Sequence, residues 1–319
     1  MLAYCDKRIA VVGATGFIGS HVTERLIESG ADVLGIGRSS LLPGSFKFLS
    51  RMHYARVDVA NFEEVRKLFA EFRPQKVFHL AAQPDAGESF GQMRDCIRQN
   101  TEAVLNVLEA SAKAQADTFI FGDSSKVYGN SPLPYSEQTV DDPVCSYAVS
   151  KAAAWKLCKL YSSLNPNIFV AAVRPTMVYG PRQKINLISF LCSRMDRQET
   201  VSIQGGWQTR DPLYIDDAVE AFLKIGVTPE TNGHAIPIGG GQELTVSEIC
   251  RIVLNSFGSD LKLNFDPSSL RTTEIFRSSC DNSDALRLLG WKPRISFQEG
   301  IGRLARLSAE KLVSSVAAV

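Results

Sequence analysis

A glycine-rich turn between an apolar strand and an amphipathic helix is the sequence feature that most restricts the fold. Residues 9–12 are a short apolar run, which predicts a buried parallel strand, and residues 21–30 have apolar positions at helical spacing. Three glycines between them follow the order G-x-x-G-x-x-G, so the backbone can approach a pyrophosphate that faces the positive end of the helix. The residues predicted to contact a dinucleotide in this turn are Gly13, Thr15, Gly16, Phe17, Ile18 and Gly19.

Length, charge and cysteine content limit the classes of protein to which the chain can belong. The 319 residues suffice for one large domain or for two lobes that share a sheet, and 45% are hydrophobic. A formal net charge of +1 indicates neither a nucleic-acid partner nor a membrane surface. No apolar run reaches the roughly 18 residues of a membrane span, and the first strand leaves no room for a signal peptide. Seven scattered cysteines are typical of reduced thiols, so we expect a cytoplasmic protein without a metal site.

Strand and helix patterns alternate along the first part of the chain. Further strands are predicted at 33–37, 53–59, 76–82, 118–123 and 167–174, and helices at 61–72, 92–115 and 147–164. This alternation predicts an α/β fold with a doubly wound parallel Rossmann sheet, whose strands place functional groups at their carboxyl ends. We expect a dinucleotide-binding domain over residues 1–180 and a smaller, mainly substrate-binding lobe over 181–319, either separate or interleaved.

The end of the second predicted strand bears on the choice of cofactor. The position that often carries an acid for the ribose hydroxyls is Gly37, and Arg38 and Ser39 follow it. An arginine and a hydroxyl suit a 2′-phosphate that a carboxylate would repel, which favours NADP over NAD. The alternative is that Arg38 is a solvated loop charge. Other predicted cofactor contacts are Asp58, Val59, Leu80, Ala81, Ala82, Asn100, Pro175 and Val178.

Tyr147 and Lys151 predict acid–base chemistry. They lie four residues apart in YAVSK near the start of a predicted helix, which stacks both side chains on one face. A tyrosine phenol has an ordinary pKa of about 10 and is a poor base at neutral pH, but a nearby ammonium and an oxidised nicotinamide favour the phenolate. Tyr147 can then remove a hydroxyl proton while hydride leaves the same carbon. Ser124, just past the fifth predicted strand, can hold the reacting hydroxyl, unless it only fills a turn.

Taken together, the motifs resemble the extended short-chain dehydrogenase/reductase family, in particular its nucleotide-sugar epimerases, dehydratases and reductases. They span roughly residues 8–300 and include GATGFIG (13–19), HLAA (79–82), SSKVYG (124–129), YAVSK (147–151), RPTMVYGP (174–181) and GGWQTRDPLYIDD (205–217). The resemblance implies that Tyr147 is the acid/base, that Lys151 binds the nicotinamide ribose and that Ser124 assists at the sugar. It also implies a homodimer through four-helix packing of helices 92–115 and 147–164. The substrate contacts that it implies are Ser125, Met177, Arg210, Arg271 and Glu274, with Arg210 on the diphosphate.

Departures from the family pattern bear on the reaction. In 4,6-dehydratases an Asp and a Glu follow the catalytic hydroxyl, whereas this chain has Ser125 and Lys126, which lack the carboxyls that elimination of water needs. Met177 stands where many members have a substrate-binding Asn.

The leading expectation is an NAD(P)-dependent nucleotide-sugar 4-epimerase that acts through a transient 4-keto sugar. The alternative is an NADPH-dependent 4-keto-sugar reductase, which Arg38 favours. A 4,6-dehydratase and a non-catalytic binding or scaffold member of the fold are less favoured. The residues identify neither the nucleotide base nor the sugar.

Overall fold

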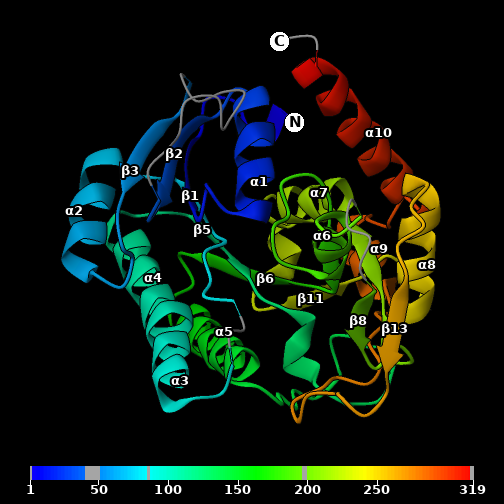
Figure 1. Cartoon of the computed structure of the whole chain (residues 1–319). Coiled ribbons are helices and arrows are strands. Elements are labelled where there is room, and N and C mark those ends of the chain that lie inside the picture. The colour runs from blue at the N-terminus through cyan, green and yellow to red at the C-terminus, as the bar shows by residue number, and fades with distance from the viewer. Residues whose placement is uncertain (1, 40–50, 85–86, 196–199, 317–319) are drawn as a thin grey trace.

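A parallel sheet forms the centre of the computed structural model, which describes residues 2–39, 51–84, 87–195 and 200–316. Its seven strands follow the order β11-β6-β5-β4-β1-β2-β3, and every neighbouring pair is parallel (Figure 1). The chain winds outward from β1 in both directions, so the doubly wound prediction is confirmed. The strands are β1 (Arg8–Val12), β2 (Asp32–Gly37), β3 (His53–Arg56), β4 (Lys76–His79), β5 (Thr118–Gly122), β6 (Phe169–Pro175) and β11 (Ala235–Ile238).

Helices cover both faces of this sheet because successive strand residues point to opposite sides. Ile9 and Val11 of β1 belong to one apolar core, and Ala10 and Val12 belong to the other. The first core is closed by α1 (Phe17–Glu28) and α7 (Ile215–Ile225), and the second by α2 (Phe62–Phe72), α4 (Ala103–Lys113) and α5 (Ser146–Leu164).

Three predicted boundaries differ from the structure. The strands predicted at 53–59 and 76–82 end at Arg56 and His79. The residues after Arg56 turn away because the Asp58 carboxylate accepts a hydrogen bond from the Ala60 nitrogen at 3.1 Å. The helix predicted at 92–115 is divided into α3 (Phe90–Ile97), a π-helical segment (Arg98–Glu102) and α4.

The second half of the chain builds a smaller lobe but also returns to the sheet. It supplies α7 and β11, and β11 pairs with β6 at the sheet edge. β7 (Met177–Tyr179) in turn pairs with β10 (Pro212–Tyr214), so the chain crosses the predicted division at residue 181. The other elements are α6 (Leu187–Cys192), β8 (Val201–Gln204), β9 (Thr209–Arg210), β12 (Leu244–Thr245), α8 (Val246–Phe257), β13 (Leu263–Asp266), α9 (Ser283–Leu289) and α10 (Phe297–Val316).

Helix α10 has 20 residues. Neither it nor any other helix in the described part of the chain combines the length and apolar character needed to cross a membrane.

Candidate active site

The glycine turn after β1 has a geometry that only glycine permits at two positions. Gly13 has a φ of +86°, and a Cβ there would lie 2.6 Å from the backbone nitrogen of Ala81. A Cβ on Gly19 would lie 2.0 Å from the carbonyl oxygen of Gly13. Gly16 is the N-cap of α1 and has no side chain to accept from the N–H groups of the first turn. These N–H groups at the positive helix end therefore suit the pyrophosphate of a dinucleotide.

Most of the predicted cofactor residues lie at one edge of the sheet because all seven strands run in the same direction. They are Gly13, Thr15, Gly16, Phe17, Ile18 and Gly19 after β1, Arg38 and Ser39 after β2, Asp58 and Val59 after β3, Leu80, Ala81 and Ala82 after β4, and Pro175 at the end of β6. Val178 is buried in β7. Their individual cofactor contacts stay predictions.

At the end of β2, Gly37 occupies the position of the acid that often binds ribose hydroxyls, and a side chain there would crowd two neighbouring side chains. A Cβ on Gly37 would lie 2.8 Å from both the Thr15 Oγ1 and the Tyr54 hydroxyl. The exposed Arg38 follows, and its carbonyl oxygen accepts from the Nε of Arg56 at 3.0 Å. Two arginines thus end neighbouring strands, and sequence reasoning identified only Arg38.

Asn100 links the loop after β4 to α5 through hydrogen bonds. The π-helical segment that holds Asn100 buries it completely. Its Nδ2 donates to the Gln83 carbonyl at 3.1 Å and to the Ser150 Oγ at 2.9 Å, and its Oδ1 accepts from the Gln83 nitrogen at 2.7 Å. Asn100 thereby positions the backbone beside Ala81 and Ala82, where the cofactor ribose is predicted to lie.

The three predicted catalytic residues lie on segments that pack together at the carboxyl end of β5. Lys151 is buried, and its Nζ donates to the carbonyl oxygen of Gly122, the last residue of that strand, at 2.5 Å. Ser124 lies two residues further on, where its Oγ accepts from the Lys126 nitrogen at 3.3 Å. The half-buried Tyr147 lies one helical turn before Lys151, and the Lys126 Nζ is 5.6 Å from the centre of its ring.

Burial dominates the electrostatics of Lys151. Loss of hydration lowers the pKa of Lys151 to about 8, and the opposite effect of the neighbouring Asp123 is smaller. The Nζ also lies 4.5 Å from the centre of the Phe121 ring, which adds a cation–π contact. An ammonium held at this depth is poised to favour a phenolate on the same face of α5.

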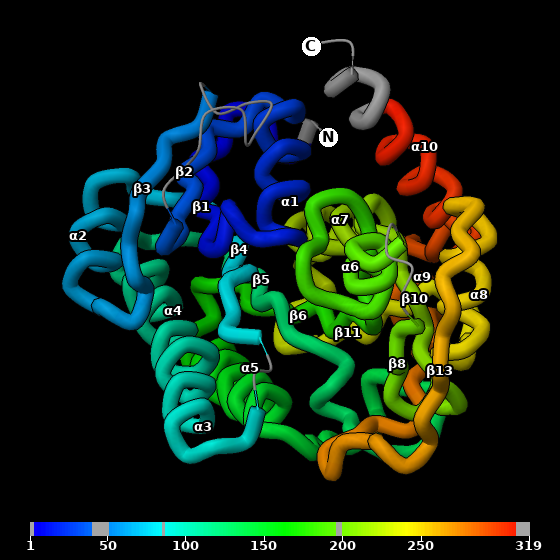
Figure 2. The backbone as a smooth tube through the Cα atoms, in the orientation of Figure 1, coloured from blue at the N-terminus to red at the C-terminus, as the bar shows by residue number. Residues whose placement is uncertain are grey.

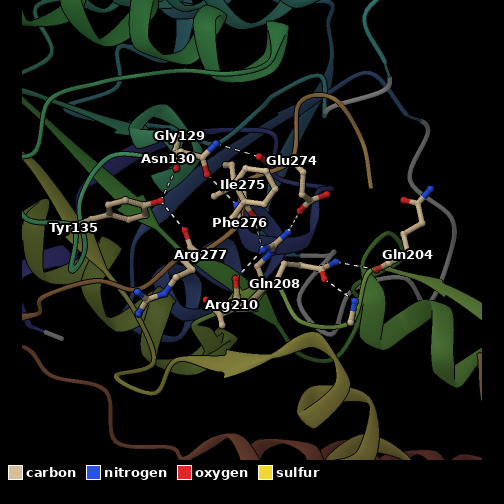
Figure 3. A network of polar contacts seen from close by, with 12 residues as sticks. Gly129, Asn130, Tyr135, Gln204, Gln208, Arg210, Glu274, Ile275, Phe276 and Arg277 are labelled. Atoms are coloured by element: carbon tan, nitrogen blue, oxygen red, sulfur yellow. Dashed lines mark hydrogen bonds and ion pairs between the residues drawn. The ribbon is translucent and has the colours of Figure 1, made fainter. Parts of the chain in front are cut away.

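On the substrate side, Arg210 and Glu274 form one unit across 64 residues of sequence. The Arg210 Nη2 makes an ion pair with the Glu274 carboxylate (Figure 3). Its Nη1 donates to the carbonyl oxygens of Thr209 at 2.7 Å and Ile275 at 2.9 Å. Of the other predicted substrate contacts, Ser125 is buried beside Ser124, Met177 is half-buried in β7 and Arg271 is exposed.

The segment that carries Glu274 is also hydrogen-bonded to the loop after Ser124. The Asn130 Nδ2 donates to the Glu274 carbonyl at 3.2 Å, and its Oδ1 accepts from the Phe276 nitrogen at 2.9 Å. The Tyr135 hydroxyl lies 2.6 Å from the Gly129 carbonyl oxygen and 3.1 Å from that of Arg277. Figure 2 shows these segments side by side. Sequence reasoning missed this link, because no local pattern indicates it.

Comparison with known proteins identifies the group to which this fold and site belong. The model of the NAD dependent epimerase/dehydratase family matches residues 9–239, which is more than half of the chain. The chain belongs to this family. The expected resemblance to extended short-chain dehydrogenase/reductase enzymes of nucleotide-sugar metabolism is thereby confirmed.

Individual members of the NAD dependent epimerase/dehydratase family match this chain over nearly its whole length. The UDP-glucose 4-epimerase of Mycolicibacterium smegmatis is 29% identical, over 95% of this chain and 99% of that protein. The structure of an epimerase from Methanothermobacter thermautotrophicus has a TM-score of 0.90 and 27% identity, over 98% of this chain and 94% of that one. A Bacillus cereus UDP-glucuronic acid 4-epimerase, solved with UDP-glucuronic acid and NAD, has a TM-score of 0.83 and 31% identity. The match covers 92% of this chain and 96% of that one.

The buried ammonium of this family member has a measurable effect on stability. We expect Lys151→Met to raise the free energy of unfolding at pH 7 by up to about 3 kcal/mol, because the pKa of Lys151 falls from 10.5 to about 8 on folding. Between these pH values the unfolded chain binds more protons, so the unsubstituted protein gains stability as pH rises. Urea unfolding at pH 7 to 10 should show the difference between the two proteins shrinking, and a constant difference would contradict the buried ammonium.

Proposed function

We propose that the protein is a nucleotide-sugar 4-epimerase that oxidises the sugar at C4 and reduces the 4-keto sugar from its other face. We base the proposal on Ser124 and the buried Lys151 at the carboxyl end of β5, with Tyr147 one helical turn before Lys151, and on a glycine turn that fits a dinucleotide. The names of the relatives support a reaction at C4 of a nucleotide sugar.

Each residue has a distinct task in this reaction. The bound nicotinamide supplies the acceptor and the donor of hydride. Tyr147 takes the proton of the C4 hydroxyl and returns it to the same oxygen after hydride has reached the other face of C4, Ser124 holds the reacting oxygen, and Lys151 favours the phenolate. The fork of Arg210 suits a diphosphate, although binding has to share or displace its ion pair with Glu274.

Net reduction of a 4-keto sugar is the second candidate, since the same three residues serve it in one direction. Arg38 and Arg56 at the ends of β2 and β3 favour a 2′-phosphate, and Gly37 supplies no carboxylate for the ribose hydroxyls. We therefore propose NADP as the preferred cofactor of this NAD-dependent family member. Ser125 and Lys126 in place of two carboxyls argue against elimination of water.

The choice between epimerisation and reduction can be made with the purified protein and a panel of nucleotide sugars. In the epimerase, C4 inverts with only trace cofactor, and NMR of the sugar detects both epimers. We expect Tyr147→Phe to lower kcat about 10²- to 10⁴-fold with little change in substrate affinity, because the phenol acts mainly in the transition state. Tyr161→Phe, the same change on the same helix, should keep kcat. Consumption of NADPH in proportion to product would instead identify a reductase.

Cofactor preference depends on the exposed arginine after β2. We expect Arg38→Ala to weaken NADPH binding about tenfold or more while NADH binding changes little, because the charge-assisted hydrogen bonds go to the 2′-phosphate alone. Nucleotide fluorescence titration measures both affinities, and Arg94→Ala on α3 is the control. Equal losses for the two nucleotides would overturn the NADP proposal.

We also propose a homodimer through α3 and α5. Both helices expose apolar side chains at helical spacing, which a four-helix interface with a second copy would bury. These side chains are Phe90, Met93 and Ile97 on α3 and Val149, Leu157, Leu160 and Leu164 on α5.

A buried charge in that interface should separate the copies. Leu160→Glu is expected to give a monomer in light scattering after gel filtration, because an unpaired carboxylate is costly to bury. Leu286→Glu on α9 is the matched control, since the side chain is 54% exposed compared with 55% for Leu160. If Leu160→Glu leaves the mass unchanged, the assignment of α5 to the interface is wrong.

A further inference from the structure

Lys151 and three further charged side chains behind it form a series that alternates in sign. Asp123 directly follows β5 and precedes Ser124, and its Oδ2 accepts from the Arg174 Nε at 2.7 Å. Arg174 also donates from Nη1 and Nη2 to the two oxygens of Asp141, at 2.8 and 3.3 Å. The exposed fractions of the Asp123, Arg174 and Asp141 side chains are 0%, 4% and 14%. The series therefore begins at Lys151, passes through Asp123 and Arg174, and ends at Asp141 near the surface.

Contacts from three segments of the chain hold these charged side chains in place. The Asp123 nitrogen donates to the Val173 carbonyl of β6 at 2.9 Å, and Arg174 is the next residue of that strand. The Arg174 guanidinium lies 4.9 Å from the centre of the Tyr128 ring. Asp141 lies in the loop that leads into α5, the helix of Tyr147 and Lys151. The two ion pairs thus join the end of β5, the end of β6 and the approach to α5.

One oxygen of Asp123 is not used in the pair with Arg174. Its Oδ1 is buried and has no hydrogen-bond partner among the described residues. The Lys151 Nζ is bound to the carbonyl of Gly122, the residue directly before Asp123. A buried carboxylate with an open oxygen is costly unless cations lie close by; here Arg174 is paired with it, and the ammonium of Lys151 is bound to the preceding residue and feels its charge.

We propose that Asp123 is a positioning residue whose buried carboxylate, held by Arg174, keeps the ammonium of Lys151 charged beneath the reaction centre. Its consequence for catalysis rests on the proposed function, because a neutral Lys151 would no longer favour the Tyr147 phenolate. Without Asp123, burial would lower the pKa of Lys151 further and leave a smaller fraction of it charged at neutral pH.

The other groups around Lys151 do not supply this negative charge. Burial raises the pKa of the Cys158 thiol on the same helix, so it stays a thiol at neutral pH. Burial lowers the pKa of His79 on β4 to about 3, so the imidazole is neutral. Burial also raises the pKa of Asp123, and Arg174 and Lys151 oppose that rise only in part; the charge on Asp123 is supported by its 2.7 Å bond to the Arg174 Nε.

The test is the titration of Lys151 in the full-length protein, with and without the Asp123 charge. Lysine labelled with ¹³C at Cε gives one resonance per residue, and the one that disappears in Lys151→Met reports Lys151. In Asp123→Asn we expect its titration midpoint to move about one pH unit or more to lower pH, the size typical of losing a close opposite charge. The fall of kcat at alkaline pH should also move to lower pH.

Asp141→Asn is the matched control, because it also removes a carboxylate bonded to Arg174 but lies on the far side of that arginine. Its Lys151 midpoint should move much less than that of Asp123→Asn. If Asp123→Asn does not fold, Asp123→Ser takes its place, because the shorter side chain leaves room for water near Arg174. We expect the same shift of the Lys151 midpoint to lower pH in this variant.

An unchanged midpoint in the Asp123 variants, or an equal shift in Asp141→Asn, would overturn the inference. Because the NMR readout needs no turnover, it remains decisive even if no nucleotide sugar reacts, an outcome that would refute the proposed function alone.

Discussion

The site depends on a single buried hydrogen bond, from the ammonium of Lys151 to the last carbonyl of β5. This bond joins the helix that carries Tyr147 to the strand end that carries Ser124. Burying an ammonium is unfavourable, and its lowered pKa measures that cost. The surrounding structure compensates with a carbonyl, an aromatic face and the carboxylate of Asp123. The buried ammonium thus lowers the free energy of unfolding at the position where the proposed reaction needs a positive charge close to the Tyr147 phenol.

The parallel sheet determines where every other group lies. Because its strands run in one direction, the glycine turn, the arginines at the ends of β2 and β3 and the serine after β5 all lie at one edge. The second half of the chain then brings the Arg210–Glu274 pair towards this edge and is held there by Asn130 and Tyr135. The lobe that is proposed to bind substrate is therefore positioned by the loop that follows Ser124.

Local patterns were sufficient to predict the sheet, the glycine turn and the helix that carries Tyr147 and Lys151, because strand and helix periodicity and the glycine spacing are short-range signals. The contacts that organise the site are not short-range. Arg210 meets Glu274 across 64 residues, and Arg174 meets Asp123 across 51. Asp123 stands beside Ser124 in the sequence, yet the pattern indicated only the last residue of a strand. The π-helical turn around Asn100 also lacks a sequence signature that separates it from an ordinary helix.

On the proposed function, hydride leaves C4 of the sugar and returns to C4 within one active site, while Tyr147 exchanges only the hydroxyl proton. A nucleotide sugar that turns over and carries deuterium at C4 tests this directly when unlabelled reduced cofactor is in excess and the label is followed by NMR. We expect both epimers to retain deuterium at C4. Transfer of the label to the bulk cofactor or to water would show that hydride does not return to the carbon that it left.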